Sequence, residues 1–292
     1  MADLLNIILP TFIVIFIGYI FGKIAKVDLS VVVDLVLYIG LPALAFTSML
    51  DKNIVLLEAA KVWAAAIMIM LGCGAVAWII FKIIKQKHSG LYIPILIMNT
   101  VNIPFPILYL AYGSEGLFAA TLFYIPNVLL IYSLGVYIAA GKHWKESIKE
   151  VFKVPPIYAA LIGLLLNLFD IIVPDLIIKP MNFISMMVIP LVLLVLGSNL
   201  SKVKFTSLPT TLVASFLRVG IGLLFGLLAV NLFNLTGILR LVVIFDSAMP
   251  SAVNSAILAT KYKNEAALVS SVVFITTTAS LVIIPFLLYV LS

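Results

Sequence analysis

Charged side chains are scarce in this 292-residue sequence, since Asp, Glu, Lys and Arg make up 10% of it while hydrophobic residues make up 64%. About a quarter of the residues in a soluble domain are charged, so the composition excludes an ordinary soluble protein. The apolar residues come in runs long enough to cross about 30 Å of hydrocarbon. We therefore expect an all-α polytopic membrane protein that lies in a lipid bilayer.

Reactive side chains are also few. The single cysteine, Cys73, lies among glycines and apolar residues, and the two histidines, His88 and His143, have no partner at metal-ligand spacing. The sequence has no glycine-rich phosphate loop and no nucleophile flanked by a base. We therefore expect no enzymatic activity, no metal and no cofactor, and the chain alone is not an ATP-driven pump.

The formal net charge is +6, but the lysines that produce it sit in short loops between apolar runs. Membrane topology explains basic residues in that position, so no nucleic-acid partner is expected. The hydropathy pattern predicts ten spans. They cover about residues 4–22, 31–50, 62–84, 91–111, 116–140, 156–173, 181–200, 208–233, 237–260 and 266–291.

The basic residues also predict the orientation of the chain. The loops after spans one, three, five, seven and nine hold thirteen lysines, whereas the alternate loops hold four basic residues. By the positive-inside rule the first set is cytoplasmic, so both termini are extracytoplasmic in a bacterial or archaeal plasma membrane. The thirteen are Lys23, Lys26, Lys82, Lys85, Lys87, Lys142, Lys145, Lys149, Lys153, Lys202, Lys204, Lys261 and Lys263, and the four are Lys52, Lys61, Lys179 and Arg240.

Two apolar spans are interrupted by amides and prolines. Proline removes a backbone donor and opposes continuous helix, and a half-helix that restarts inside a membrane exposes free N–H groups and the positive end of its dipole. Such an end favours an anion, and paired broken helices mark the binding site of secondary transporters. The candidate substrate-binding residues are Asn99, Asn102, Pro104 and Pro106 in span four, and Asp246, Pro250, Ser251 and Asn254 in span nine.

A second interpretation of these residues stays open. The amides can cap the broken helix ends, and the prolines can adjust helix packing, without any ligand. Polar groups elsewhere in the spans, namely Asp34, Asn127, Tyr132, Asn182 and Asn199, are assigned to packing or capping.

The interruptions occupy corresponding places in two halves of the chain. Tyr112 with Glu115 returns as Tyr262 with Glu265, and Pro42 returns as Pro190, at nearly the same offset. Five spans in each half make the halves inverted repeats. We expect residues 1–141 to form the first five-helix repeat and residues 142–292 the second.

Arg218 and Asp246 are two charged residues expected deep in consecutive antiparallel spans. The sequence predicts that they form an ion pair. A structural role and a role in charge compensation or proton coupling both remain open.

The interrupted spans resemble two motifs of the auxin efflux carrier family. The stretch from Asn99 to Pro106 resembles the segment N-T-G-N-x-G-x-P of that family, with Val101 and Pro104 where glycine is usual. The stretch from Met249 to Asn254 resembles the segment M-P-x-A-x-N. The resemblance covers the whole chain.

This resemblance implies ten helices in two inverted repeats, with the broken fourth and ninth helices crossing at the membrane centre. It implies a PIN-like elevator carrier with a scaffold at about residues 1–50 and 155–200, a transport domain at about 54–141 and 205–292, and a homodimeric assembly. The expected function is secondary transport of a small organic anion, such as an auxin-like or dicarboxylate compound, whose carboxylate would meet Asn102. The alternatives are a sodium-coupled bile-acid-type symporter of the same architecture and a ligand-binding membrane receptor that does not transport.

Overall fold

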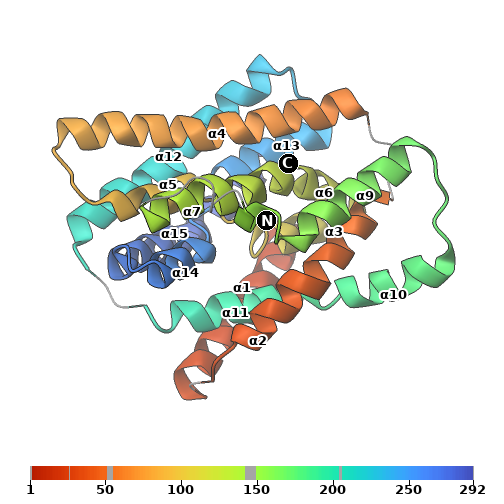
Figure 1. Ribbon diagram of the computed structural model, residues 1–292, viewed down its shortest axis with the longest axis horizontal. Coiled ribbons are helices and arrows are strands. Elements are labelled where there is room, and N and C mark those ends of the chain that lie inside the picture. The colour runs from red at the N-terminus through yellow and green to blue at the C-terminus, as the bar shows by residue number, and fades with distance from the viewer. Residues whose placement is uncertain (1, 26, 51–54, 142–148, 204–205, 292) are drawn as a thin grey trace.

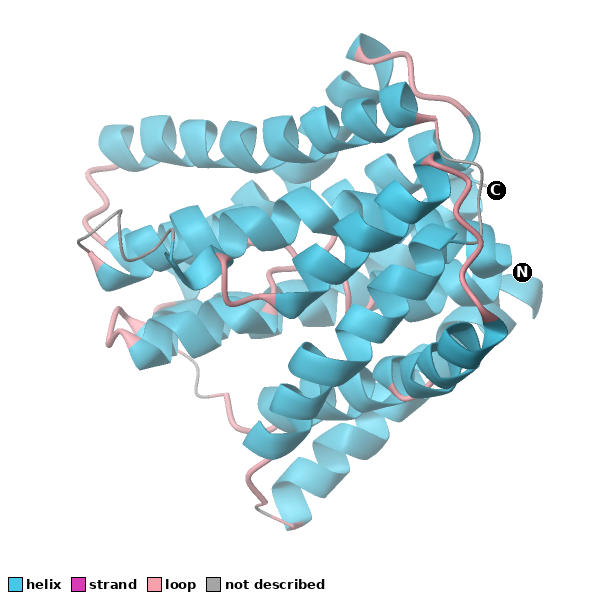
Figure 2. Ribbon diagram, turned by 45° about the vertical axis from the view of Figure 1, so that its right-hand side comes forward, coloured by secondary structure: helices cyan, strands magenta, loops and turns pink. Residues whose placement is uncertain are grey.

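A computed structural model describes residues 2–25, 27–50, 55–141, 149–203 and 206–291, and in these ranges the regular elements are helices without a β-strand. Seven helical stretches are long and apolar enough to cross a membrane. These are Asn6–Ile24, Ser30–Leu50, Leu56–Ile83, Pro104–Ala140, Asp175–Leu200, Leu208–Leu232 and Ala266–Leu291. The all-helical membrane architecture expected from composition is therefore present (Figures 1 and 2).

The described part of the first half contains four membrane-length apolar stretches, and a break in the helix precedes the last of them, Pro104–Ala140. Its elements are α1 (Ala2–Ile24), α2 (Ser30–Leu35), the π-helical turn η1 (Val36–Gly40), α3 (Leu41–Leu50), α4 (Leu56–Ile83), the short turn η2 (Ser89–Leu91), α5 (Tyr92–Leu96), α6 (Pro104–Leu130), the π-helical turn η3 (Ile131–Gly135) and α7 (Val136–Ala140). Gly113 interrupts α6, because its backbone has φ 59° and ψ −146°, a conformation that glycine adopts without steric cost.

The second half contains one broken helical segment as well. Its elements are α9 (Pro155–Leu168), α10 (Asp175–Ser185), α11 (Val188–Leu200), α12 (Leu208–Leu232), α13 (Gly237–Ser247), α14 (Val253–Lys261) and α15 (Ala266–Leu291). It is interrupted between α13 and α14, as the first half is between α5 and α6. Figure 1 shows where these elements lie.

Several predicted boundaries are wrong for local reasons. The third span begins at Leu56 rather than residue 62, because Glu58 and Lys61 pair at 2.6 Å within the first helical turns. The seventh begins at Asp175 rather than residue 181, where Asp175 and Lys179 pair at 2.9 Å. Such pairs extend a helix beyond its apolar part. The sixth ends at Leu168 rather than residue 173, followed by a turn with Asp170 at φ 51°.

The helices pack in two groups. In one group α1 lies along α11, and α3 lies along α9 and α10. In the other, α12 packs against α4, α13 and α15, while α13 packs against α6. Figure 1 shows α1, α2 and α11 together on one side of the molecule and α4, α12 and α13 on the other.

Within the first group, α1 and α11 approach so closely that their backbones touch. A Cβ atom added to Gly197 would lie 1.9 Å from the carbonyl oxygen of Ile15, and one added to Gly18 would lie 2.3 Å from that of Leu194. Helices in membranes associate through such small-residue contacts. Direct backbone contact therefore fixes how α1 and α11 pack against each other.

This close approach predicts the effect of one methyl group. Gly197→Ala should destabilise the protein by about 1–3 kcal/mol, the usual cost of overpacking, because the new atom meets backbone that cannot move aside. The melting temperature of the purified protein in detergent measures the effect. Gly74→Ala is the matched control, since its Cβ would meet only the flexible Leu96 side chain. Equal melting temperatures for the two variants would contradict the prediction.

Candidate functional site

The two interruptions predicted from the sequence are present and contact each other. The backbone N–H of Asn99 donates to the carbonyl oxygen of Pro250 at 2.8 Å, and that of Ala252 donates to the carbonyl oxygen of Ile97 at 3.0 Å. Met98 and Ser251 therefore face each other as an isolated antiparallel bridge. Hydrocarbon offers no hydrogen bonds to free backbone groups. Each break therefore supplies hydrogen bonds to backbone groups of the other.

Prolines and one serine shape this crossing. Pro104 is at the first position of α6, where its missing N–H costs nothing, and Pro250 lies in the extended segment itself. The hydroxyl of Ser251 donates to the carbonyl oxygen of Pro94 at 2.7 Å, and the N–H of Ser251 donates to Oγ1 of Thr276 at 3.1 Å. Ser251 is fully buried, so it ties the crossing together.

Arg218 on α12 joins the ends of both broken helices. It is fully buried, and it donates from Nη1 to the carbonyl oxygen of Ile95 at 3.1 Å and from Nη2 to that of Ser247 at 2.6 Å. These carbonyls lie at the C-terminal ends of α5 and α13, where each helix dipole places partial negative charge. The guanidinium of Arg218 thus compensates the partial negative charge at the C-terminal ends of both helices.

The predicted ion pair between Arg218 and Asp246 is absent, which corrects the sequence analysis. Both carboxylate oxygens of Asp246 are buried and have no hydrogen-bond partner among the described residues. The physical reason is that the guanidinium is engaged by two backbone carbonyls. Gly222, one turn along α12, leaves room for this contact, since its added Cβ would lie 2.3 Å from Nη2 of Arg218.

A cavity of about 350 Å³ lies beside the crossing, within the usual range for small-molecule sites. We call it the central cavity. It is bounded by the crossing, α6, η3 and α14 on one side and by α2, η1 and α11 on the other. Its lining residues are Val33, Asp34, Val36, Leu37, Leu41, Met98, Asn99, Thr100, Val101, Asn102, Tyr124, Asn127, Val128, Ile131, Tyr132, Val192, Val195, Asn199, Ala252, Val253, Asn254, Ile257, Leu258 and Lys261.

Two amides in this lining are buried with unused hydrogen-bonding atoms. Oδ1 of Asn99 accepts from the N–H of Asn102 at 2.9 Å, while its Nδ2 has no partner among the described residues. Nδ2 of Asn127 donates to the carbonyl oxygen of Met98 at 3.2 Å and to Oγ1 of Thr100 at 2.5 Å, and its Oδ1 is likewise unpartnered in the described chain. Buried polar atoms without partners are costly, and each of these two amides keeps one such atom beside the cavity.

The half-helices that restart after the breaks begin at the same cavity. Ala252, Val253 and Asn254, at the start of α14, line it, and so do Val101 and Asn102 just before α6. The start of α14 therefore presents N–H groups and a positive dipole end to the cavity, while the negative ends of α5 and α13 are bound by Arg218. The first turn of α6 offers no such donors, because Pro104 and Pro106 lack an N–H group and those of Phe105 and Ile107 donate to the carbonyl oxygens of Val101 and Ile103.

Three of the eight predicted substrate residues line the central cavity, namely Asn99, Asn102 and Asn254. The other five do not: Pro104, Pro250 and Ser251 shape the crossing, Asp246 is buried in α13, and Pro106 lines another cavity.

Four residues assigned to packing or capping, Asp34, Asn127, Tyr132 and Asn199, do line the central cavity. Their polarity within apolar spans was the only sequence signal for them.

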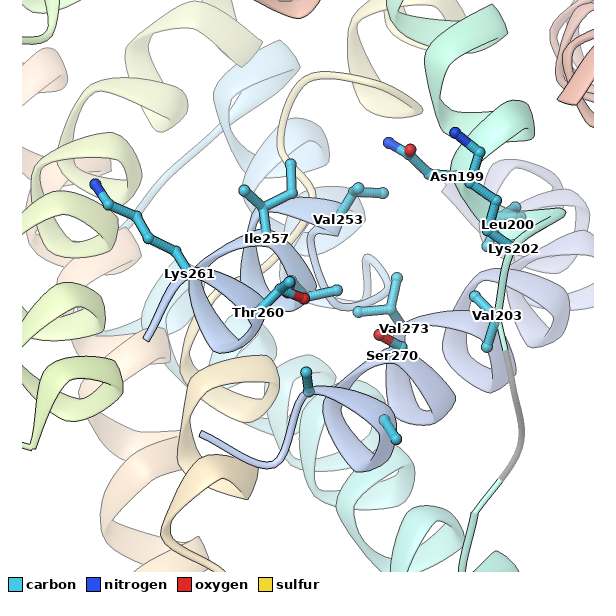
Figure 3. A pocket seen from close by; sticks show the side chains of 13 residues that line it. Asn199, Leu200, Lys202, Val203, Val253, Ile257, Thr260, Lys261, Ser270 and Val273 are labelled. Atoms are coloured by element: carbon cyan, nitrogen blue, oxygen red, sulfur yellow. The ribbon is translucent and has the colours of Figure 1, made fainter. Parts of the chain in front are cut away.

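Two other cavities lie away from the three amides. One of about 670 Å³ lies between α1, α3, α10, α11 and the start of α6. The other, of about 580 Å³, lies between α11, α14 and α15 and is called the lateral cavity here (Figure 3). Neither is lined by Asn99, Asn102 or Asn254, so the central cavity is the candidate site.

Known proteins similar to this chain are transporters. A family model described as a membrane transport protein matches residues 142–288. An uncharacterized transporter of Methanocaldococcus jannaschii is 28% identical over 298 residues, which cover 96% of each chain. An uncharacterized transporter of Methanothermobacter thermautotrophicus is 26% identical over 289 residues, 95% of each chain.

The Arg218 contacts predict a stability effect independent of Asp246. Arg218→Met should cost about 2–4 kcal/mol, because two carbonyls lose their donor at about 1–3 kcal/mol each, partly offset by removal of a buried charge. Chemical denaturation in detergent measures the cost. Arg240→Ala, at an exposed residue 3.3 Å from Asn231, is the control and should change stability by less than about 0.5 kcal/mol.

A double-mutant cycle with Asp246→Asn follows from the same contacts. Its effect should add to that of Arg218→Met within about 0.5 kcal/mol. A larger coupling energy would show that the two side chains do interact.

Proposed function

Because the chain belongs to the auxin efflux carrier family of membrane transport proteins, we propose that it is a secondary carrier that moves a small organic anion through the central cavity. The observation that supports this most is that three amide residues, Asn99, Asn102 and Asn254, line one cavity at which α14 begins. A carboxylate that leaves water must exchange its hydration for fixed donors. Amides and helix N-termini supply such donors.

The remainder of the lining favours an organic anion over an inorganic one. Valine, leucine and isoleucine side chains make up much of the wall, and Tyr124 and Tyr132 add aromatic surface. Apolar walls with a few placed polar groups are typical of sites for small organic molecules. Both an auxin-like compound and a dicarboxylate have the carboxylate that this proposal requires.

Ten spans in two inverted repeats remain part of the proposal. Three further spans would join the seven membrane-length stretches. They are the short α9, the pair α13–α14, and the span gained when the stretch from Pro104 to Ala140 is divided at Gly113. The packing of α1 on α11 and of α3 on α9 is reciprocal, as inverted repeats 1–141 and 142–292 require. Residues 142–148, where the second repeat would begin, lie outside the described residues.

An elevator motion would use the same two groups of helices. The scaffold would comprise residues 1–50 and 155–200, and the transport domain residues 54–141 and 205–292, with the central cavity between them. We further propose a homodimer in the plasma membrane, with both termini extracytoplasmic. Lys26, Lys52, Lys142, Lys145 and Lys204, which contribute to the orientation argument, lie outside the described residues.

Two measurements test the proposed function. A screen of organic anions by thermal stabilisation of the purified protein should find a ligand, because a compound that binds only the folded state raises its stability by mass action. Counterflow of that anion in proteoliposomes should then show transport. Binding without counterflow would favour a receptor, and counterflow that requires sodium would favour a sodium-coupled symporter.

The amides at the half-helix starts provide the mutational test. Asn102→Ala and Asn254→Ala should each weaken anion binding by about 1–3 kcal/mol, or about 5- to 150-fold, the cost of losing a hydrogen bond to a charged group. Titration of the purified protein with the anion found in the screen measures the dissociation constant. The melting temperature without ligand should hardly change.

Asn231→Ala is the matched control, because Asn231 is exposed at the end of α12 and does not line the central cavity. Asn127 is not suitable as a control, since it bonds to the crossing. If both crossing variants bind and transport like the parent, the amides only cap helices.

A further inference from the structure

We propose that Lys261 is an anion subsite at the mouth of the central cavity, which captures the substrate carboxylate before it reaches the amides at the crossing. The inference rests on the proposed function and adds a residue that the sequence analysis counted only toward membrane topology. It depends on the face that α14 presents to the cavity, on the charges in the lining, and on the position of a neighbouring lysine.

One face of α14 lines the central cavity along its whole length. Asn254, Ile257, Leu258 and Lys261 all belong to the lining, and their spacing of three, four and seven residues places them on one side of a helix. Seven residues correspond to about 10 Å of helix. The face therefore carries an amide at the crossing and an ammonium group about two turns away.

Charge in the central cavity is limited to two residues of the described lining, Asp34 on α2 and Lys261 on α14. Both are exposed, and neither forms an ion pair within the described chain. Nζ of Lys261 lies over the ring of Tyr262, 5.4 Å from its centroid. The ammonium group is thus free to meet an anion.

Figure 3 shows the direction of this side chain relative to the lateral cavity. Lys261 extends from the end of α14 on the side away from Lys202 and Ser270, and it belongs to the lining of both the lateral and the central cavity. The ammonium group of Lys261 therefore lies on the other side of α14 from Lys202 and Ser270.

The position at the mouth determines what Lys261 can contribute. A cation in a cleft raises the local concentration of anions, and salt screens its effect when the site is open to water. A lysine ammonium is a strongly hydrated point charge, so we expect it to attract and release the carboxylate rather than retain it. Asp34, across the lining, would oppose anions and limit accumulation.

A simpler role for Lys261 is to stabilise the C-terminus of α14 through the helix dipole. Lys263 separates the two roles. It lies in the turn after α14, two residues beyond Lys261, adds the same charge to the topology count, and does not line the central cavity. Lys263→Gln is therefore the matched control for Lys261→Gln, and Lys261→Arg is the variant that keeps the charge.

The first test measures the potential in the cavity without any substrate. In a Leu258→Cys protein in detergent, the new thiol would lie three residues from Lys261 on α14, at a position that lines the central cavity and not the lateral cavity, and the native Cys73 is fully buried. Its reaction rates with a sulfonate-bearing and a trimethylammonium-bearing methanethiosulfonate reagent are compared as a ratio. Lys261→Gln should lower this anion-to-cation ratio about 3- to 10-fold, Lys261→Arg should restore it, and Lys263→Gln should leave it unchanged.

An unchanged ratio in Lys261→Gln, or an equal fall in Lys263→Gln, would overturn the proposal. The second test uses counterflow of malonate and of indole-3-acetate in proteoliposomes. Lys261→Gln should raise KM about 3- to 10-fold with little change in maximal rate, and Asp34→Asn should lower KM. If the parent moves and binds no organic anion, the proposed function fails while the thiol ratio still decides the role of Lys261.

Discussion

The structure depends on the meeting of two broken helices, in which each helix break supplies hydrogen bonds to the other. Unpaired backbone groups cost several kcal/mol each in hydrocarbon, so neither break is stable alone. The bonds from Asn99 to Pro250 and from Ala252 to Ile97 satisfy part of both breaks. The crossing also separates helix ends of opposite sign: the positive end of α14 lies at the central cavity, and the negative ends of α5 and α13 share the guanidinium of Arg218.

The sequence predicted the breaks and their amides well because the signal is local. A proline or an asparagine inside an apolar span conflicts with a continuous helix, and this alone identified Asn99, Asn102 and Asn254. The partners of Arg218 were mispredicted because a search for opposite charges does not consider backbone carbonyls. Tyr132 and Asn199 line the cavity only because η3 and α11 pack around it, and no short sequence pattern encodes that packing.

The helix contacts differ between the inside of the proposed scaffold and its boundary with the rest of the chain. Between α1 and α11 the backbones are in direct contact at Gly197, which fixes one arrangement. At the boundary, cavities of about 350, 580 and 670 Å³ separate α11 and its neighbours from the crossing, α14 and α6. Packed interfaces resist sliding because interiors deform little, whereas a boundary with cavities breaks fewer contacts when it moves. The proposed elevator motion requires this contrast.

The separation of the mouth from the crossing also bears on how a carrier can both bind and release an anion. A fixed cation deep in the membrane would be costly when the site is empty, and it would retain a carboxylate strongly once bound. Neutral donors such as the amide of Asn102 and the start of α14 impose neither penalty. A lysine at the mouth can increase the rate of loading, because its charge stays hydrated and screened. On this argument charge governs access to the cavity, and neutral hydrogen bonds govern occupancy at the crossing.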